Sequence, residues 1–256
     1  MALTFESPRR KAWHMAPVWV GMLGVAALSW VYLVHMPMGM AGKDMGGPPS
    51  QTAMLLPALA MWMVMMLAMM LPTVAPSAAV FGQFALKRHP ATARHAVASY
   101  VVGYAVSWVA FAVPAAMLQT LLTAVAWLDP MARSSNALMS ALILIGAGVY
   151  QLSPLKGACL SKCRSPLAYF LAQWRDGLSG AFTLGVRHGG YCVGCCWTLM
   201  AVMFVVGAMN LVWMGAITLL VLGEKLAPPG WQLHRVAGVG LVGAGMWVGI
   251  GIWMPI

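Results

Sequence analysis

The residue types best suited to chemistry lie in one short segment, residues 188–196, which reads HGGYCVGCC. Thiolate and imidazole are the ligands that soft and borderline metal ions select, and a Cys-x-x-Cys spacing lets two sulfurs converge on one ion. The candidate ligands in this segment are His188, Cys192, Cys195 and Cys196. Adjacent cysteines seldom both bind one ion, so one of the last two could be spare. The segment predicts metal ligation or redox chemistry rather than apolar packing of cysteine.

A second pair of cysteines, Cys159 and Cys163, lies upstream among Lys156, Lys162 and Arg164. Positive neighbours favour the thiolate form that binds metal. Alone the pair is a weak signal. Together with Cys192 and Cys195 it could complete one four-ligand site, or the two pairs could pass an ion between two sites.

Methionine is the third signal, because the chain contains 23 methionines. Four of them fall within a narrow arc of a predicted helix, namely Met54, Met61, Met65 and Met69. Thioether sulfur is a soft ligand suited to Cu(I), so this arc predicts a path for copper. Met63, Met66 and Met70 would occupy the opposite face, and the alternative is that all of these methionines fill gaps in apolar packing.

A glycine- and proline-rich segment precedes this helix and offers His35, Met36, Met38 and Met40 as a copper capture site outside the cell. The alternative is a solvated loop in which methionine has no special role.

Catalytic chemistry finds little support in the sequence. The acidic residues number five: Glu6, Asp44, Asp129, Asp176 and Glu224. No catalytic triad, carboxylate dyad or phosphate-binding glycine loop is visible, so proton-relay and hydrolytic reactions are not expected and no catalytic residue is assigned. Glu224 and Lys225 are adjacent at the end of an apolar stretch, where we expect them to form an ion pair.

The elements that must position these residues are membrane helices. Of 256 residues 61% are hydrophobic and 8% are charged, whereas a soluble domain carries about 25% charged residues. The apolar stretches are residues 16–36, 54–86, 96–128, 137–152, 197–223 and 236–256. Backbone groups in hydrocarbon must bond within their own segment, so we expect one all-α membrane domain over 1–256, with six to seven transmembrane helices.

Two regions should depart from straight helices. Pro57 predicts a kink in the second stretch, and Pro72 and Pro76 predict its end. Residues 177–196 predict a broken or re-entrant segment, because Arg187 and His188 follow an apolar run too short to cross a bilayer. Either 177–190 dips in and returns, or it pairs with 191–207 as short helices and the chain turns near residues 207–210.

The basic clusters predict topology rather than nucleic-acid binding, although the formal net charge is +10. Placing the N-terminus in the cytoplasm puts most lysines and arginines on that side. Residues 1–15 and 154–176 are then cytoplasmic, and residues 37–53 form the outer methionine-rich loop. The glycine-rich last stretch favours tight helix packing and could make a homo-oligomer.

Several motifs in fixed order carry a family resemblance. They include Ala68-Met69-Met70-Leu71-Pro72-Thr73, Cys159 to Cys163, His188-Gly189 to Cys195-Cys196-Trp197, Met209-Asn210-Leu211 and Glu224-Lys225 with Pro228. On these motifs the chain resembles the bacterial family called domain of unknown function 2182, described as predicted metal-binding integral membrane proteins. The resemblance implies a bacterial inner membrane and metal binding at the matching His188, Cys159, Cys163, Cys192, Cys195 and Cys196. It supplies no established activity.

The leading hypothesis is a protein in the lipid bilayer that binds a soft metal ion, copper rather than zinc, and transports it or hands it on. A metal-donating or metal-accepting protein would be its partner. One alternative is a membrane thiol-disulfide oxidoreductase that uses the Cys-x-x-Cys pair. Another is a metal-free membrane assembly factor.

Overall fold

The computed structural model describes residues 8–35, 51–129, 132–228 and 230–253. These residues form nine helices and no strand apart from an isolated bridge between Leu128 and Ser134. The helices are α1 (Pro8–His35), α2 (Gln51–Arg88), α3 (Ala93–Ala124), α4 (Ala137–Leu152), α5 (Pro154–Arg164), α6 (Pro166–Gln173), α7 (Gly177–Val206), α8 (Leu211–Leu226) and α9 (Leu233–Trp253). The predicted all-α fold is confirmed.

Five of the described helices are long and apolar enough to cross a bilayer: α1, α2, α3, α7 and α9. A sixth span forms if α4 and α5 count as one, although their axes are bent by 62°. With that pair counted as one span, the described residues form six spans, the lower end of the predicted six to seven. Large apolar side chains are exposed on the outer helices, as with Val20 and Leu28 on α1 and Trp247 on α9. This is the surface that lipid tails require.

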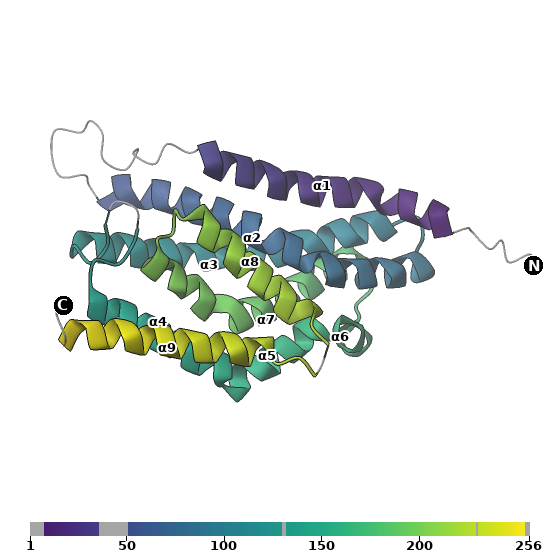
Figure 1. Cartoon of the computed structure of the whole chain (residues 1–256). Coiled ribbons are helices and arrows are strands. Elements are labelled where there is room, and N and C mark those ends of the chain that lie inside the picture. Colours follow the sequence, from purple (N-terminus) through teal and green to yellow (C-terminus); the bar gives the residue numbers. More distant parts are fainter. Residues whose placement is uncertain (1–7, 36–50, 130–131, 229, 254–256) are drawn as a thin grey trace, which may run out of the picture.

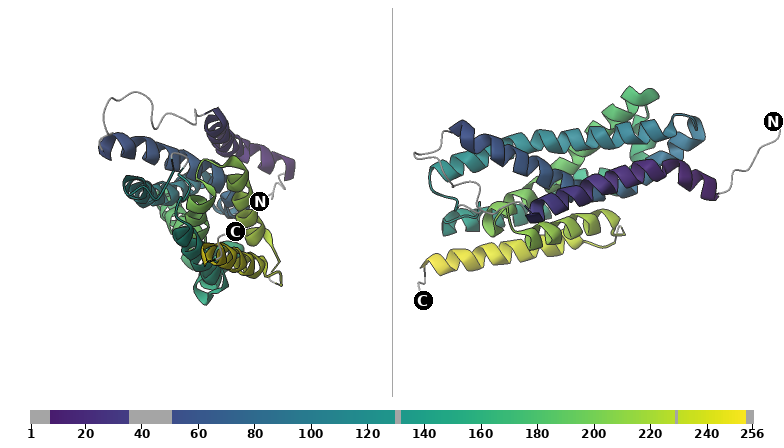
Figure 2. Two further views of the ribbon diagram at one scale, coloured as in Figure 1. Left: turned by 60° about the vertical axis from the view of Figure 1, so that its left-hand side comes forward. Right: turned by 90° about the horizontal axis from the view of Figure 1, so that it is seen from above.

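The long helices run side by side along one direction, with α1 on one flank of the bundle and α9 on the opposite flank (Figures 1 and 2). The short helices α5 and α6 lie toward one end, together with the turn between α2 and α3 and the first residues of α1. The start of α2 and the end of α9 lie at the other end. The cysteine-bearing helices α5 and α7 contact each other directly.

The segment 177–196 differs from the expected broken or re-entrant structure, because it belongs to the single helix α7. The two polar residues that suggested a break, Arg187 and His188, are accommodated within the continuous helix. Arg187 Nη1 donates to Gln173 Oε1 at 2.8 Å, and His188 lies among aromatic rings. The chain turns after Val206, at Gly207 with φ +96°, as one of the two interpretations of this region predicted.

The predicted end of the second helix at Pro72 and Pro76 is wrong, since α2 continues through both prolines to Arg88. Proline lacks the N–H that would bond the carbonyl four residues earlier. For Pro72 that carbonyl belongs to Ala68, and it accepts the indole N–H of Trp30 at 3.1 Å. A side chain of α1 thus replaces the missing helical bond, which lets α2 stay continuous.

Close packing of α3 against α7 depends on glycine. A Cβ at Gly185 would collide with the Tyr100 carbonyl, and a Cβ at Gly189 would lie 2.7 Å from the Ser107 side chain. These two glycines are separated by three residues, a spacing that lets helix backbones approach each other in membranes. The approach brings the next turn of α7, with Cys192, against Tyr104 of α3.

Candidate metal centre

Three cysteine sulfurs meet at the contact between α5 and α7. The Sγ atoms of Cys163, Cys192 and Cys195 all lie within 4.8 Å of one another. All three side chains are buried. Cys192 and Cys195 lie three residues apart on α7 and so point in similar directions from one helix, while α5 supplies the third sulfur. Ligands from two helices can thus converge on one ion.

The other two predicted cysteine ligands lie beside this group. Cys196 is buried, and its Sγ is 3.1 Å from that of Cys195. Cys159 is half-buried one turn before Cys163, with its sulfur against Gly194, where an added Cβ would lie 3.1 Å away. Neither belongs to the three-sulfur group.

His188 is 1% exposed and lies one turn before Cys192 on α7. Its ring centroid is 5.5 Å from that of Tyr169 and 6.0 Å from those of Tyr100 and Tyr104. The Nδ1 atom has no hydrogen-bond partner. His188 stays outside the three-sulfur group, but a buried ring nitrogen without a partner is costly and remains available to a ligand.

A buried lysine supports the cysteines from α8. Lys225 Nζ donates to Thr73 Oγ1 at 2.9 Å, to the Thr73 carbonyl at 3.2 Å and to the Tyr104 hydroxyl at 3.3 Å. Tyr104 in turn donates its hydroxyl hydrogen to Cys192 Sγ at 3.1 Å. The described residues give Lys225 no carboxylate partner. Its positive charge therefore faces the sulfur group through one tyrosine hydroxyl.

The expected ion pair between adjacent Glu224 and Lys225 is therefore not formed. Glu224 Oε2 accepts a hydrogen bond from Lys156 Nζ at 2.7 Å, and both side chains are 0% exposed. Gln151 Nε2 donates to the second carboxylate oxygen at 3.3 Å. Residues adjacent on a helix point in different directions, so Glu224 meets α4 and α5 while Lys225 meets α2 and α3.

The methionines of α2 are buried on more than the predicted arc. Met61, Met65 and Met69 are buried, but so are Met66 and Met70, which were expected on the opposite face. Met70 Sδ lies 3.9 Å from Thr73 Oγ1, which Lys225 also contacts. A methionine outside the predicted path thus lies beside the polar network of the candidate metal centre.

The capture site predicted at the start of the methionine path falls largely outside the described residues, which leave out Met36, Met38 and Met40. His35 is the last residue of α1 and is exposed. Met54 is half-buried near the start of α2, at the end of the bundle away from α5 and α6.

Sequence reasoning missed Thr73 and Tyr104, and it gave Lys225 the wrong partner. The sequence did indicate that Lys225 needs a partner, because a lysine at the end of an apolar stretch must find a buried partner or reach the membrane interface. Thr73 and Tyr104 carried no such signal, because hydroxyl residues in apolar helices commonly bond to their own backbone.

A family described as "PpoB2: Copper chaperone" matches residues 59–248. The matched range contains all five cysteines, His188 and the lysine network. The chain belongs to this family. Comparison with curated proteins and with solved structures found no match. The family supports copper as the ion, which the sequence analysis inferred from the soft sulfur donors, while the link to domain of unknown function 2182 stays a resemblance of motifs.

The donor set fits copper as cargo. Thiolate sulfurs select soft ions such as Cu(I), and three of them lie close together in a buried site. An unpartnered imidazole nitrogen lies one helical turn away.

Proposed function

We propose that this chain is a membrane copper chaperone that holds Cu(I) between Cys163, Cys192 and Cys195 and then hands it on. The observation that carries the proposal is the approach of three buried thiol sulfurs to within 4.8 Å of one another. They lie beside Lys225, which has no carboxylate partner in the part of the chain that the structure describes. Family membership supports copper as the ion. His188 is a candidate fourth ligand during transfer.

Charge balance supports a monovalent ion. Buried charges are tolerated when they are paired. Two thiolates and one Cu(I) carry a net charge of −1, which the ammonium of Lys225 neutralises through Tyr104. The site is therefore neutral with copper bound when the third cysteine remains a thiol. A structural zinc ion would instead need four protein ligands in a tetrahedron, and the close group has three.

Residues at the two ends of the helix bundle support a direction for copper transfer. Buried methionines of α2 run from Met61 to Met70 and lead toward Thr73 at the metal centre. The segments that carry Lys87 (the end of α2), Lys162 (α5) and Arg175 (between α6 and α7) lie toward the end with α5 and α6. The positive-inside rule makes this end cytoplasmic. We therefore propose a bacterial inner-membrane protein with a cytoplasmic N-terminus and a methionine path from outside.

A second candidate function, thiol-disulfide exchange, is favoured by the 3.1 Å separation of the Cys195 and Cys196 sulfurs. Exchange with a partner needs an accessible thiol, however, and Cys192, Cys195 and Cys196 are all at most 1% exposed. Thiol titration of metal-free protein after mild oxidation separates the two functions. A redox pair would cycle between free and bonded forms without copper.

The direct test of copper binding is a Cu(I) titration of purified protein in detergent against a coloured Cu(I) chelator. We expect one tightly bound Cu(I), and strongly weakened binding in each of Cys163→Ser, Cys192→Ser and Cys195→Ser. The matched control is Cys159→Ser, because Cys159 lies on the same helix as Cys163 but outside the three-sulfur group. Equal loss in all four variants, or no copper in the wild type, contradicts the proposal.

A further inference from the structure

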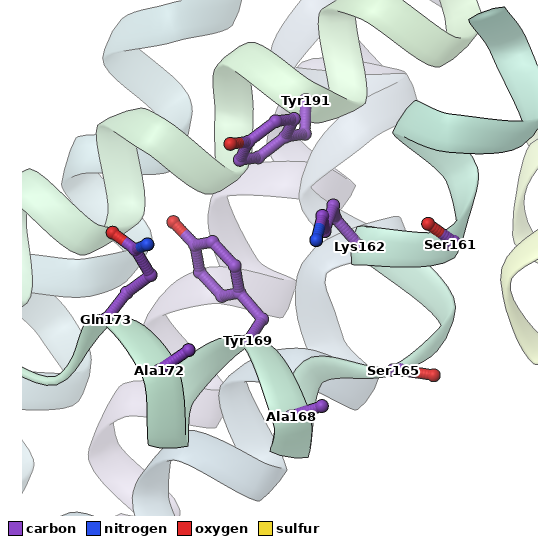
Figure 3. A pocket seen from close by; sticks show the side chains of 8 residues that line it. All are labelled: Ser161, Lys162, Ser165, Ala168, Tyr169, Ala172, Gln173 and Tyr191. Atoms are coloured by element: carbon purple, nitrogen blue, oxygen red, sulfur yellow. The ribbon is translucent and has the colours of Figure 1, made fainter.

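A surface cavity of about 260 Å³ lies where α5, α6 and α7 meet. Figure 3 shows the side chains that line it: Ser161, Lys162, Ser165, Ala168, Tyr169, Ala172, Gln173 and Tyr191. The amine of Lys162, the amide of Gln173 and the hydroxyls of both tyrosines point toward the shared space. A small ligand would therefore meet several hydrogen-bonding groups at once.

The cavity has the charge that suits an anion. No carboxylate lines it, and within the described residues Lys162 has no acidic partner. Arg187 adds a second cation beside the rim, where it bonds to Gln173 Oε1 and leaves the amide N–H groups of Gln173 as donors.

The cavity also borders the metal centre. Tyr169 forms its wall, and the other side of this side chain packs on His188 with ring centroids 5.5 Å apart. Cys163 directly follows the cavity residue Lys162 on α5. The three sulfurs themselves are buried, so copper must pass neighbouring side chains to reach them.

We propose that this cavity docks a small anionic thiol that carries Cu(I), on the end of the bundle opposite the methionine path. The proposal rests on the proposed copper function and names the carrier class. Cu(I) bound by two thiolates is an anionic complex, which matches a cavity with cations and neutral donors. The carrier's own carboxylates would meet Lys162 and the Gln173 amide.

The exchange step is a ligand substitution without electron transfer. In the loading direction, a Cu–S bond forms to Cys163 and one Cu–S bond to the carrier breaks. The proton of the Cys163 thiol goes to the departing carrier thiolate, which leaves as a neutral thiol. Copper stays Cu(I), and the complex keeps its charge of −1. A second substitution, by Cys192, releases the other carrier thiolate as a neutral thiol, and Cys195 then adds as a neutral thiol ligand. The reverse order unloads the ion.

The test measures the rate of Cu(I) transfer between carrier and full-length protein in nanodiscs of neutral lipid. Glutathione serves as the anionic carrier and 2-mercaptoethanol as a carrier without carboxylates. Lys162→Gln should slow transfer from the glutathione complex roughly three- to tenfold, because removing a charge at a binding rim lowers the association rate. Transfer from the mercaptoethanol complex, which carries a charge of −1 but no carboxylates, should slow less than transfer from the glutathione complex. The equilibrium Cu(I) affinity should stay unchanged. Lys87→Gln, an exposed lysine on α2, is the matched control.

A second pair of variants tests whether the carrier occupies the cavity, by filling its volume with a larger side chain. Ala168→Trp fills the cavity and should slow transfer from the glutathione complex, whereas Leu171→Trp on the exposed face of α6 should not. Equal rates in Lys162→Gln and the wild type would overturn the docking proposal while copper binding stands. The measurement is repeated in nanodiscs of anionic lipid. A rate that follows lipid charge rather than carrier charge would also overturn the docking proposal, since the cavity would then hold a lipid phosphate. If the wild type takes up no Cu(I) from either carrier, the proposed copper function fails as well.

Discussion

Two buried lysines in this protein have opposite surroundings. Lys156 on α5 forms a 2.7 Å ion pair with Glu224, and Gln151 donates a hydrogen bond to the other oxygen of that carboxylate. Lys225, the next residue after Glu224, has only hydroxyl and carbonyl oxygens within hydrogen-bond distance among the described residues. The first lysine is neutralised within the fold, whereas the second has its charge directed toward sulfur.

The difference separates a structural charge from a functional one. A paired buried charge ties helices together and needs nothing more. A buried cation without a carboxylate is stable only if another negative group lies near, and the sulfur of Cys192 is linked to Lys225 through Tyr104. The two sites should therefore respond differently to mutation: the first in stability, the second in copper affinity.

The largest expected effect is on stability at the paired site. Lys156→Met leaves Glu224 buried without a cation, which should lower the free energy of unfolding by about 3–5 kcal/mol. Denaturant unfolding in detergent micelles measures the change. An unaltered unfolding midpoint would show that Glu224 is neutral or hydrated, and that the ion pair with Lys156 does not stabilise the fold.

The next effect is on copper at the unpaired site. Lys225→Met should weaken Cu(I) binding roughly 10- to 100-fold, in the range for groups that support metal ligands from outside the coordination shell. Chelator competition gives the affinity. Lys87→Met is the control for loss of an exposed lysine. Unchanged affinity would mean that the charge of Lys225 does not act on the sulfur site.

A smaller effect is expected at the bridge between lysine and sulfur. Tyr104→Phe keeps the ring but removes the hydroxyl that bonds Cys192 and Lys225. Loss of one such hydrogen bond corresponds to about 0.5–1.5 kcal/mol, or roughly three- to tenfold in Cu(I) affinity. Tyr100→Phe on the same helix removes a hydroxyl that bonds Ser77 instead and is the matched control. Equal losses in both variants would point to general loosening of α3.

The smallest effect is expected when both partners of the ion pair are replaced. Lys156→Met with Glu224→Leu removes both buried charges, which is often neutral or stabilising in proteins. We expect the unfolding midpoint to return to that of the wild type and Cu(I) affinity to be retained. A double variant as unstable as Lys156→Met alone would show that packing, rather than charge, causes the loss.

The helical fold could be predicted well because hydrocarbon leaves a chain of this composition few options. The breaks in it were harder to place. Pro72 was expected to end a helix, but Trp30, distant in sequence, bonds the carbonyl that the proline leaves free. His188 was expected in an irregular segment, but it lies within the uninterrupted helix α7, against aromatic rings from α3 and α6. Local signals cannot reveal such distant partners.

The sequence predicted which residue types form the candidate metal centre, but not which of the candidate residues meet in it. The motif marked six cysteine and histidine positions, and the structure brings three sulfurs together. Cys159 and Cys196 lie outside the group of mutually close sulfurs, although the Sγ atom of Cys196 is 3.1 Å from that of Cys195. Met70 illustrates the same limit, since its helical face was assigned to packing and yet it lies beside Thr73.

The sequence by itself determined that the chain is a helical membrane protein rich in soft sulfur donors, because composition and apolar length decide where such a chain is stable. The tertiary structure alone decided which sulfurs meet and which lysine faces them. Convergence depends on how closely α3, α5 and α7 approach, and that approach depends on glycines and distant hydrogen bonds whose partners are separated widely along the chain.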